Sequence, residues 1–233
     1  MLEVQSLEAW YGQAQVLYGV SLAVGAGECV ALVGRNGAGK STTMKAIMGL
    51  MARRRGRVVF RGADISALPS YRIGRLGLGW VPEDRRIFTD LTVRENLAVG
   101  RQDGRDGAPT WSEEQLYALF PNLAAMPDRA GGRMSGGEQQ MLTVARTLMG
   151  NPHLVLLDEP SEGVAPLIVE EMARMIVALK KAGVAILLSE QNLHFARLVC
   201  DRAVVLEKGE VKFAGSMESL MGDEALLRTH LSV

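Results

Sequence analysis

The chain has 233 residues, of which 48% are hydrophobic and 22% are charged, so it is long and apolar enough to bury the core of one domain. Lysine plus arginine equals aspartate plus glutamate at 26 each, and this net charge of +0 gives no electrostatic case for a nucleic-acid partner. The N-terminus shows no secretory pattern, and the apolar runs are shorter than the roughly 20 residues that cross a bilayer. We therefore expect a cytoplasmic protein.

The first part of the chain is predicted to be rich in strands. Residues 1–30 read as short strands with a turn at Gly25–Gly27. The continuous apolar run Cys29–Val33 is typical of a strand buried in a parallel sheet. A helix is expected from about Ser41 to Gly49, and further strands are expected at 57–60 and 79–81.

The rest of the chain is predicted to be an α/β alternation after a helical insertion. Between about Thr89 and Ser135, helical patterns lie among loops that contain glycine and proline. Helices and strands then alternate as in an α/β domain; they are expected at 136–149, 154–157, 166–181 and 185–188. A terminal hairpin within 204–213 and a short helical tail complete the prediction.

Two further patterns are given ordinary structural interpretations. Cys29 and Cys200 each lie in an apolar stretch without CxxC spacing, so we expect two reduced thiols packed in the core. The run Arg53–Arg55 is expected to be a solvated loop face rather than a lipid or nucleic-acid site.

A phosphate-binding loop is predicted at Gly34–Ser41, which matches the pattern G-x-x-x-x-G-K-[ST] in full between a strand and a helix. Glycines let successive backbone N–H groups point at phosphate oxygens, and the helix start adds the positive end of its dipole. Lys40 is expected to contact the β- and γ-phosphates, and Ser41 to hold Mg²⁺. The other residues expected to line the nucleotide are Gly34, Asn36, Gly37, Ala38, Gly39 and Thr42. A glycine-rich turn that binds nothing is the alternative.

An acidic element is predicted at the end of the apolar strand Leu154–Leu157. Asp158 and Glu159 follow this strand directly, where the backbone turns and both carboxylates can reach the phosphate site. We expect Asp158 to support the Mg²⁺ shell and Glu159 to polarise the attacking water. Two solvated acids at a strand end are the alternative interpretation.

A second phosphate-binding helix start is predicted at Ser135–Glu138. Ser135 and Glu138 form a capping-box pattern. That pattern does not explain the consecutive glycines Gly136 and Gly137, which cost roughly 1 kcal/mol each in a helix relative to alanine. Bare N–H groups at such a helix start favour an approaching anion.

Together these motifs resemble those of ATP-binding cassette (ABC) ATPases, and the resemblance covers essentially the whole chain. It implies an α/β P-loop NTPase fold with a RecA-like core, an N-terminal antiparallel β subdomain and an inserted helical subdomain. The single domain 1–233 would divide into a core with its β subdomain (about 1–88 and 141–233) and a helical signature subdomain (about 89–140). It also implies a head-to-tail dimer, in which each ATP lies between the phosphate loop of one subunit and the signature Ser135–Glu138 of the other. Tyr11 falls where the family stacks an aromatic on adenine; an ordinary strand aromatic is the alternative.

Local segments resemble one subfamily more closely, the second ATPase subunit of bacterial branched-chain amino-acid importers, with relatives for urea and amides. These segments are 81–86, 134–140, 158–166 and 189–192. The resemblance implies two membrane permease subunits, a second cassette that is related or identical, an extracytoplasmic solute-binding protein, ATP and Mg²⁺ as cofactors, and a peripheral place on the inner face of the membrane. The transported solute and the direction of transport are not encoded in a cassette.

Three positions depart from the commonest residues of the family. Glu83 stands where most members have glutamine and keeps a hard oxygen for the metal. Gln191 stands where most members have a histidine that contacts the γ-phosphate. A glutamine donates a hydrogen bond but cannot take up a proton, so we expect Gln191 to position other groups rather than to transfer a proton. Ala165 replaces an aspartate that usually crosses the dimer interface. His194 is expected to have a surface or packing role.

Two other classes are weighed against a transport ATPase. A soluble ABC ATPase acting on DNA or ribosomes usually carries tandem cassettes or long coiled coils, and this chain shows one cassette without sustained heptads. A small-molecule P-loop kinase would not explain Ser135–Gly137.

Overall fold

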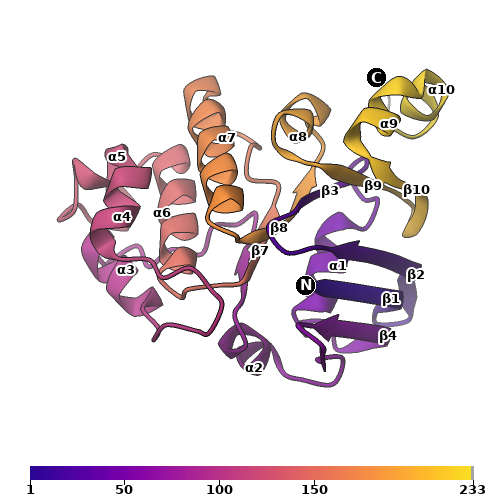
Figure 1. Ribbon diagram of the computed structural model, residues 1–233, viewed down its shortest axis with the longest axis horizontal. Coiled ribbons are helices and arrows are strands. Elements are labelled where there is room, and N and C mark those ends of the chain that lie inside the picture. Colours follow the sequence, from indigo (N-terminus) through magenta and orange to yellow (C-terminus); the bar gives the residue numbers. More distant parts are fainter. Residues whose placement is uncertain (232–233) are drawn as a thin grey trace.

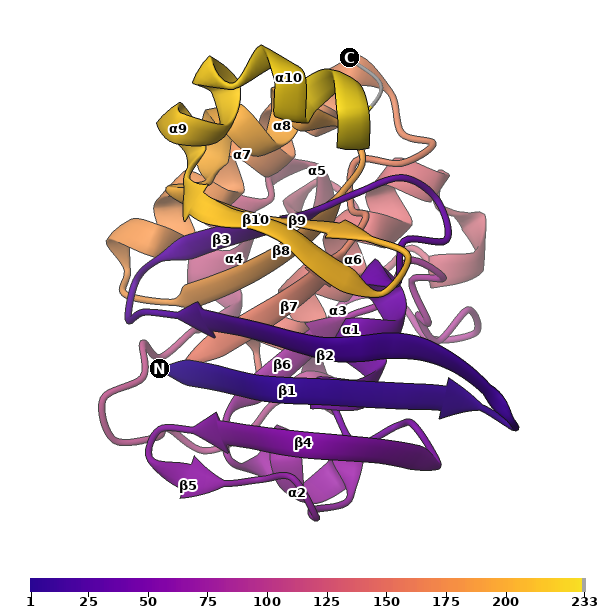
Figure 2. The same ribbon diagram turned by 90° about the vertical axis from the view of Figure 1, so that its right-hand side faces the viewer.

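Two β-sheets with a helix between them form the framework of the molecule (Figures 1 and 2). The computed structural model describes residues 1–231. A four-stranded sheet has the order β2-β1-β4-β5, and a six-stranded sheet has the order β10-β9-β3-β8-β7-β6. The strands are β1 (Leu2–Tyr11), β2 (Ala14–Val24), β3 (Cys29–Val33), β4 (Arg53–Phe60), β5 (Ala63–Asp64), β6 (Leu78–Val81), β7 (Leu154–Asp158), β8 (Ala185–Glu190), β9 (Arg202–Glu207) and β10 (Glu210–Ser216).

The helices surround the larger sheet and also form a group at one side, at the left of Figure 1. They are α1 (Lys40–Ile47), α2 (Ser70–Arg75), α3 (Val93–Gly100), α4 (Glu113–Leu119), α5 (Pro121–Ala124), the 3₁₀ turn η1 (Gly131–Arg133), α6 (Gly136–Leu148), α7 (Pro166–Lys181), α8 (Leu193–Val199), α9 (Met217–Gly222), α10 (Glu224–Leu226) and the π turn η2 (Leu227–Leu231). Within residues 1–231, no helix has both the length and the apolarity that crossing a membrane requires.

The larger sheet places the ends of its central strands at one edge. Strands β9, β3, β8, β7 and β6 run parallel to one another, whereas β10 pairs antiparallel with β9 at the sheet edge; every residue of β3, β7 and β8 is buried. Buried parallel strands need apolar side chains on both faces, which explains their continuous apolar runs. The segments after β3, β6, β7 and β8 therefore meet at the carboxyl edge, where open α/β sheets bind ligands.

Alternate residues of β3 pack into two separate cores. Cys29, Ala31 and Val33 face the core that is shared with the helical group and with α6, α7 and α8. Val30 and Leu32 face a second core, which contains α1 and the inner side of the small sheet. Figure 1 shows α1 between the two sheets. Apolar burial on both sides of one strand thus fixes the position of the loop that follows it.

The predicted α/β fold class, with its antiparallel β subdomain and inserted helices, is confirmed. Helix α7 has the predicted bounds, whereas β1 and β2 are long strands rather than several short ones. The division at residue 140 stays a prediction; α6 runs unbroken across it, and the last two residues of the domain 1–233 lie outside the described part.

The prediction that Arg53–Arg55 form a loop is wrong, because these residues begin strand β4, which pairs with β1; Arg53 and Arg55 are nevertheless exposed, as expected of a solvated run. Arg53 and Arg55 lie over the ring of Trp10, at 4.7 and 5.7 Å from its centroid. Arg54 is partly buried and donates to the carbonyls of Ala46, Ser66 and Leu68. Cation–π contacts and partners from distant residues hold this basic run in a strand.

The two cysteines are buried, as expected, and they also touch. Cys29 begins β3 and Cys200 follows α8, and their Sγ atoms lie 3.1 Å apart as free thiols. The hydrogen bond with Cys29 and burial raise the pKa of Cys200 well above its ordinary value. The thiol form is therefore favoured, and both residues serve as core packing.

Candidate functional site

A cavity of about 490 Å³ lies at the carboxyl edge of the large sheet and is lined by six of the eight residues predicted to bind nucleotide from the phosphate loop and the start of α1. Its walls come from β2, from the loop after β3 with the start of α1, and from the segments after β6 and β7. The lining residues are Val16, Asn36, Gly37, Gly39, Lys40, Ser41, Thr42, Glu83, Glu159 and Glu162. Residues separated by more than a hundred positions are thus brought to one site.

The phosphate loop is held in shape by the hairpin of β9 and β10. The N–H of Gly209, at the turn of this hairpin, donates to the carbonyl of Ala38 at 2.8 Å. A Cβ on Gly34 would lie 2.3 Å from the carbonyl oxygen of Leu206, so no larger residue fits there. Gly39 has φ +108° and precedes α1 directly, which leaves the first N–H groups of that helix facing the cavity. The loop is therefore built to present N–H donors to an anion.

Lys40 and Glu159 form a buried ion pair across this cavity. The Lys40 Nζ atom lies 3.1 Å from Glu159 Oε1, and the two side chains are only 3% and 7% exposed. The same ammonium donates to the carbonyls of Gly34 and Arg35 at 2.8 and 3.2 Å. The lysine thus points into the loop, where phosphate oxygens would meet it.

The oxygen donors expected to hold Mg²⁺ also converge. Ser41 donates its hydroxyl to Asp158 Oδ1 at 3.0 Å, and Glu83 lines both this cavity and an adjoining one that includes Asp158. Burial raises the pKa of Asp158, although the hydrogen bond from Ser41 opposes the shift. Within residues 1–231 no cluster of three His, Cys, Asp or Glu side chains forms a metal cage of its own. A hydroxyl and one or two carboxylates suit Mg²⁺, which takes its remaining ligands from phosphates and water.

Glu159 lines the cavity, where a general base for water would lie, and it contacts Gln191. Gln191 Nε2 donates to Glu159 Oε2 at 2.7 Å, although the two residues come from different strand ends. Burial pushes the pKa of Glu159 upward, but hydrogen bonds with Glu162 and Gln191 and the Lys40 charge outweigh it and lower that pKa. Glu159 is therefore an ionised carboxylate, able to orient water.

Glu162 was missed by sequence reasoning. It lines the cavity, and its hydrogen bond with Glu159 raises the pKa of Glu162 to about 7. Val16 of β2 was also missed, and it lines the cavity near the loop. The signal for Glu162 was its closeness in sequence to Glu159; an apolar strand residue such as Val16 carries no such signal.

Some predicted residues lie away from the cavity lining. Tyr11 ends β1 and is 51% exposed. Ala38 belongs to a smaller cavity behind the loop. His194 lies on α8 and is exposed, as its expected surface role requires. Gln191 contacts Glu159, so the structure connects it to the site through that residue.

The predicted signature begins α6 and lies apart from the residues that line this cavity. The capping box is confirmed: the Ser135 hydroxyl accepts from the N–H of Glu138, and Glu138 Oε2 accepts from the N–H of Ser135 at 2.7 Å. A Cβ on Gly136 would lie 2.6 Å from Arg85 Nη1, and one on Gly137 would lie 2.9 Å from Ile168. The packing of Ile168 is thus one physical reason for Gly137, whereas the flexible Arg85 side chain could move aside for a larger residue at Gly136.

The arrangement can bind a polyphosphate, hold a divalent cation and activate a water molecule. The loop N–H groups and Lys40 are placed where they would meet phosphates, Ser41 and Asp158 where they would hold a metal, and Glu159 where it would contact water. These are the parts that phosphoryl transfer to water requires.

Comparisons with known proteins agree with this chemistry. A family model described as "ABC transporter" matches residues 17–162. A high-affinity branched-chain amino acid transport ATP-binding protein of Pseudomonas aeruginosa is 42% identical over 211 residues, which cover 91% of each chain. A lipopolysaccharide export system ATP-binding protein of Haemophilus influenzae is 35% identical and covers 99% of this chain and 97% of its own.

Solved structures with similar folds are also ATP-binding subunits of ABC transporters. The ATP-binding subunit of an ABC transporter superposes with a TM-score of 0.80 at 31% identity, over 100% of this chain and 96% of the other. A nucleotide-free ATP-binding cassette superposes with a TM-score of 0.83 at 25% identity, over 100% and 98%.

Proposed function

Since the chain belongs to the ABC transporter family and is an ATP-hydrolysing cassette, we propose that it powers the import of branched-chain or other hydrophobic amino acids. The observation that carries this proposal is the 42% identity with the branched-chain amino acid transport protein, because it extends over 91% of both chains. An archaeal relative named as a probable branched-chain amino acid transport ATP-binding protein, from Archaeoglobus fulgidus, is 34% identical over 96% of this chain.

In this proposal the cassette works as one half of a head-to-tail dimer on the inner face of the membrane. The phosphate loop, Asp158 and Glu159 bind Mg–ATP on one side, and Ser135–Glu138 of a related or identical partner cassette close over the γ-phosphate. The separation of α6 from the cavity supports this arrangement, because the signature then needs a second subunit to meet nucleotide. Tyr11, exposed at the end of β1, is available to stack on adenine.

In the proposed hydrolysis of ATP, each chemical task falls to residues of this chain. Mg²⁺ held by Ser41, Asp158 and Glu83 would neutralise phosphate charge, and Glu159 would orient the attacking water with Gln191 as its positioning partner. ATP binding closes the cassettes and hydrolysis reopens them, so the permease is biased between two states by the difference in nucleotide affinity.

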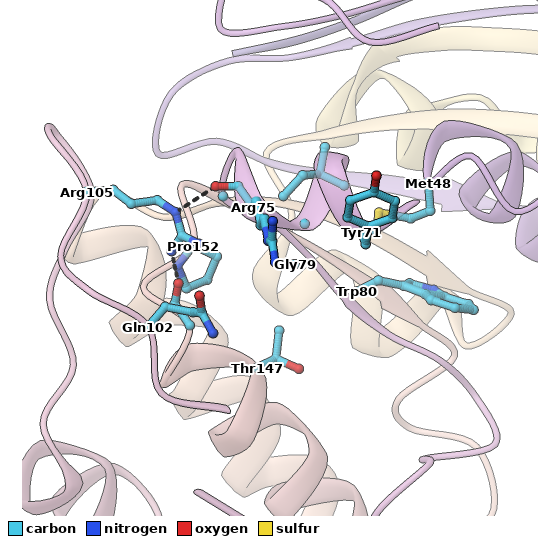
Figure 3. A pocket seen from close by; sticks show the side chains of 13 residues that line it. Met48, Tyr71, Arg75, Gly79, Trp80, Gln102, Arg105, Thr147 and Pro152 are labelled. Atoms are coloured by element: carbon cyan, nitrogen blue, oxygen red, sulfur yellow. Dashed lines mark hydrogen bonds between the residues drawn. The ribbon is translucent and has the colours of Figure 1, made fainter. Parts of the chain in front are cut away.

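A groove of about 420 Å³ is the proposed seat of a cytoplasmic helix from a permease subunit (Figure 3). It lies between α2, β6 and α6, and Figure 3 shows Tyr71, Arg75 and Trp80 around it with Thr147 on its opposite side. Arg105 donates to the carbonyls of Arg75 and Asn151 at 3.3 and 3.1 Å and so closes one end. Trp80 on β6 lines this groove and Glu83 follows it closely in the chain, so a short segment connects the groove with the proposed metal site.

Replacing Tyr71 by glutamate is expected to abolish recovery of the permease subunits while leaving ATP hydrolysis by the isolated chain unchanged. Tyr71 is 58% exposed in the groove, so a charge there opposes an apolar helix without disturbing the core. Leu198→Glu is the matched control, since Leu198 is 59% exposed on α8, which lies far from α2 in Figure 1. The measurement is co-purification in mild detergent from the native cells. Equal recovery with both variants would place docking elsewhere.

The transported solute is tested by uptake of radiolabelled leucine, isoleucine and valine into cells that lack the gene. The parent chain is expected to restore uptake, and Glu159→Gln is expected not to. Restored uptake of urea or short amides instead would favour that alternative. Unchanged amino-acid uptake with a defect in surface lipopolysaccharide would favour an export role, for which the 35% identity over 99% of the chain is the supporting observation. Recovery of ribosomal or DNA-bound partners would point to a soluble ABC ATPase.

A further inference from the structure

Glu190, the last residue of β8, is a buried carboxylate that the nucleotide site does not use. The residue is 2% exposed and does not line the nucleotide cavity. Its Oε1 atom accepts a hydrogen bond from the N–H of Ser161 at 3.1 Å, and its Oε2 atom accepts one from the N–H of Asn192 at 3.3 Å. Burying a carboxylate costs several kcal/mol unless hydrogen bonds compensate, so its position needs a reason.

The two hydrogen bonds of Glu190 join the loops that carry the reactive residues. Ser161 follows Glu159 in the loop after β7, and Asn192 follows Gln191 in the loop after β8. A third bond, from the N–H of Glu159 to the carbonyl of Ser189 at 3.0 Å, connects the loop after β7 with the end of β8 itself. Glu190 therefore sets the spacing between the backbone on each side of the Glu159–Gln191 contact.

The loop that contains Gln191 is also held at its C-terminal end, where helix α8 begins. Asn192 caps α8, because its Oδ1 atom accepts from the N–H of Phe195 at 3.1 Å. Gln191 itself is exposed, so packing contributes little to its orientation. The 2.7 Å bond from Gln191 to Glu159 depends on a backbone that Glu190 and this cap hold in place.

We propose that Glu190 is a positioning residue for ATP hydrolysis, which holds the loops after β7 and β8 so that Gln191 orients the Glu159 carboxylate. The proposal rests on the proposed role of Glu159 as the group that activates water. Glu190 makes no contact with nucleotide in this proposal. Replacing Glu190 should therefore lower the rate of turnover and leave the affinity for ATP unchanged.

The carboxylate is required because two N–H donors approach its two oxygens. A glutamine of the same shape accepts with one oxygen only and turns an NH₂ group toward the other donor. One of the two N–H groups then loses its partner on Glu190, and we expect the loop that carries it to shift. Burial raises the pKa of Glu190, and the hydrogen bonds from Ser161 and Asn192 oppose that shift.

The experiment compares Glu190→Gln with Glu171→Gln, a control on α7 whose carboxylate bonds Asn122 at 2.8 Å. Steady-state hydrolysis gives kcat and KM, equilibrium binding of a fluorescent ATP analogue gives affinity, and thermal unfolding reports the fold. We expect Glu190→Gln to lower kcat about tenfold or more with affinity unchanged within about twofold, and Glu171→Gln to match the parent. A parent-like kcat for Glu190→Gln would overturn the proposal.

A second measurement asks whether Glu190 acts through Glu159. In single-turnover assays, adding Glu190→Gln to a Glu159→Gln chain is expected to lower the residual rate no further, because groups that act as one unit are not additive. An equal drop in both backgrounds, or a joint loss of affinity and thermal stability without a change in kcat, would show a merely structural residue and overturn the proposal. If Glu159→Gln alone kept the parent rate, the role of Glu159 would fail instead. Should Glu190→Gln not fold, Glu190→Asp, which keeps the charge and is one methylene shorter, carries the same tests.

Discussion

Replacing Glu159 by glutamine is expected to lower the turnover of ATP by a factor of about 10² to 10⁴ while ATP still binds. The carboxylate accepts from Gln191 at 2.7 Å and faces the cavity that holds the phosphate loop. Its lowered pKa keeps it ionised, as a group that orients water must be. A glutamine of equal shape cannot accept a proton, and its single amide oxygen accepts from only one of the two donors, Lys40 and Gln191, that approach the carboxylate.

The measurement for Glu159→Gln is phosphate release at saturating Mg–ATP, with nucleotide binding measured in parallel. Glu170→Gln is the matched control, because Glu170 makes an exposed ion pair with Arg174 on α7, at 3.4 Å. Loss of hydrolysis with binding retained supports the assignment. Parent-like hydrolysis would assign water activation to another group.

Removing the ammonium of Lys40 is expected to weaken ATP binding about a hundredfold, because charge-assisted hydrogen bonds contribute about 1.5–3 kcal/mol each. The change also leaves the Glu159 carboxylate buried without its cation. Breaking one side of a buried ion pair typically lowers stability by about 3 kcal/mol or more. Lys40→Ala is thus expected to lose both affinity and thermal stability.

Titration with a fluorescent ATP analogue and thermal unfolding check the Lys40 prediction. Lys180→Ala is the control, since Lys180 pairs with Asp201 at 2.7 Å outside the site. This pair is more exposed, and surface ion pairs contribute about 0–1 kcal/mol, so a small effect on stability and none on affinity is expected. Tight ATP binding by Lys40→Ala would contradict the phosphate role of this lysine.

The parts of the site that sequence predicts best are local in the chain. Cys29–Ser41 and Leu154–Glu159 each contain a strand, a turn and reactive residues within a few positions, so pattern and chemistry coincide. Helix α7 was placed correctly because proline starts it and lysines end it.

Features that depend on pairing between distant residues could not be predicted. One such contact joins Glu190 and Ser161, which are separated by 29 positions in the chain. Another joins Lys40 and Glu159, which are much farther apart in the chain. Each contact forms only when strands β3, β7 and β8 align in the sheet. The basic run Arg53–Arg55 became a strand for the same reason, because β1 supplies its partners. Local propensity contains no information about such partners.

In the ion pair between Lys40 and Glu159, the carboxylate occupies the position on the ammonium that a phosphate of ATP would take, so Glu159 competes with ATP for Lys40. A triphosphate must replace the carboxylate at the ammonium, so only molecules with the pair open bind at full intrinsic strength. The apparent Kd equals the intrinsic Kd divided by the open fraction, and a pair open in about one molecule in ten weakens binding about tenfold. After phosphate leaves, the same carboxylate is expected to pair with the lysine again, which would oppose rebinding of the product.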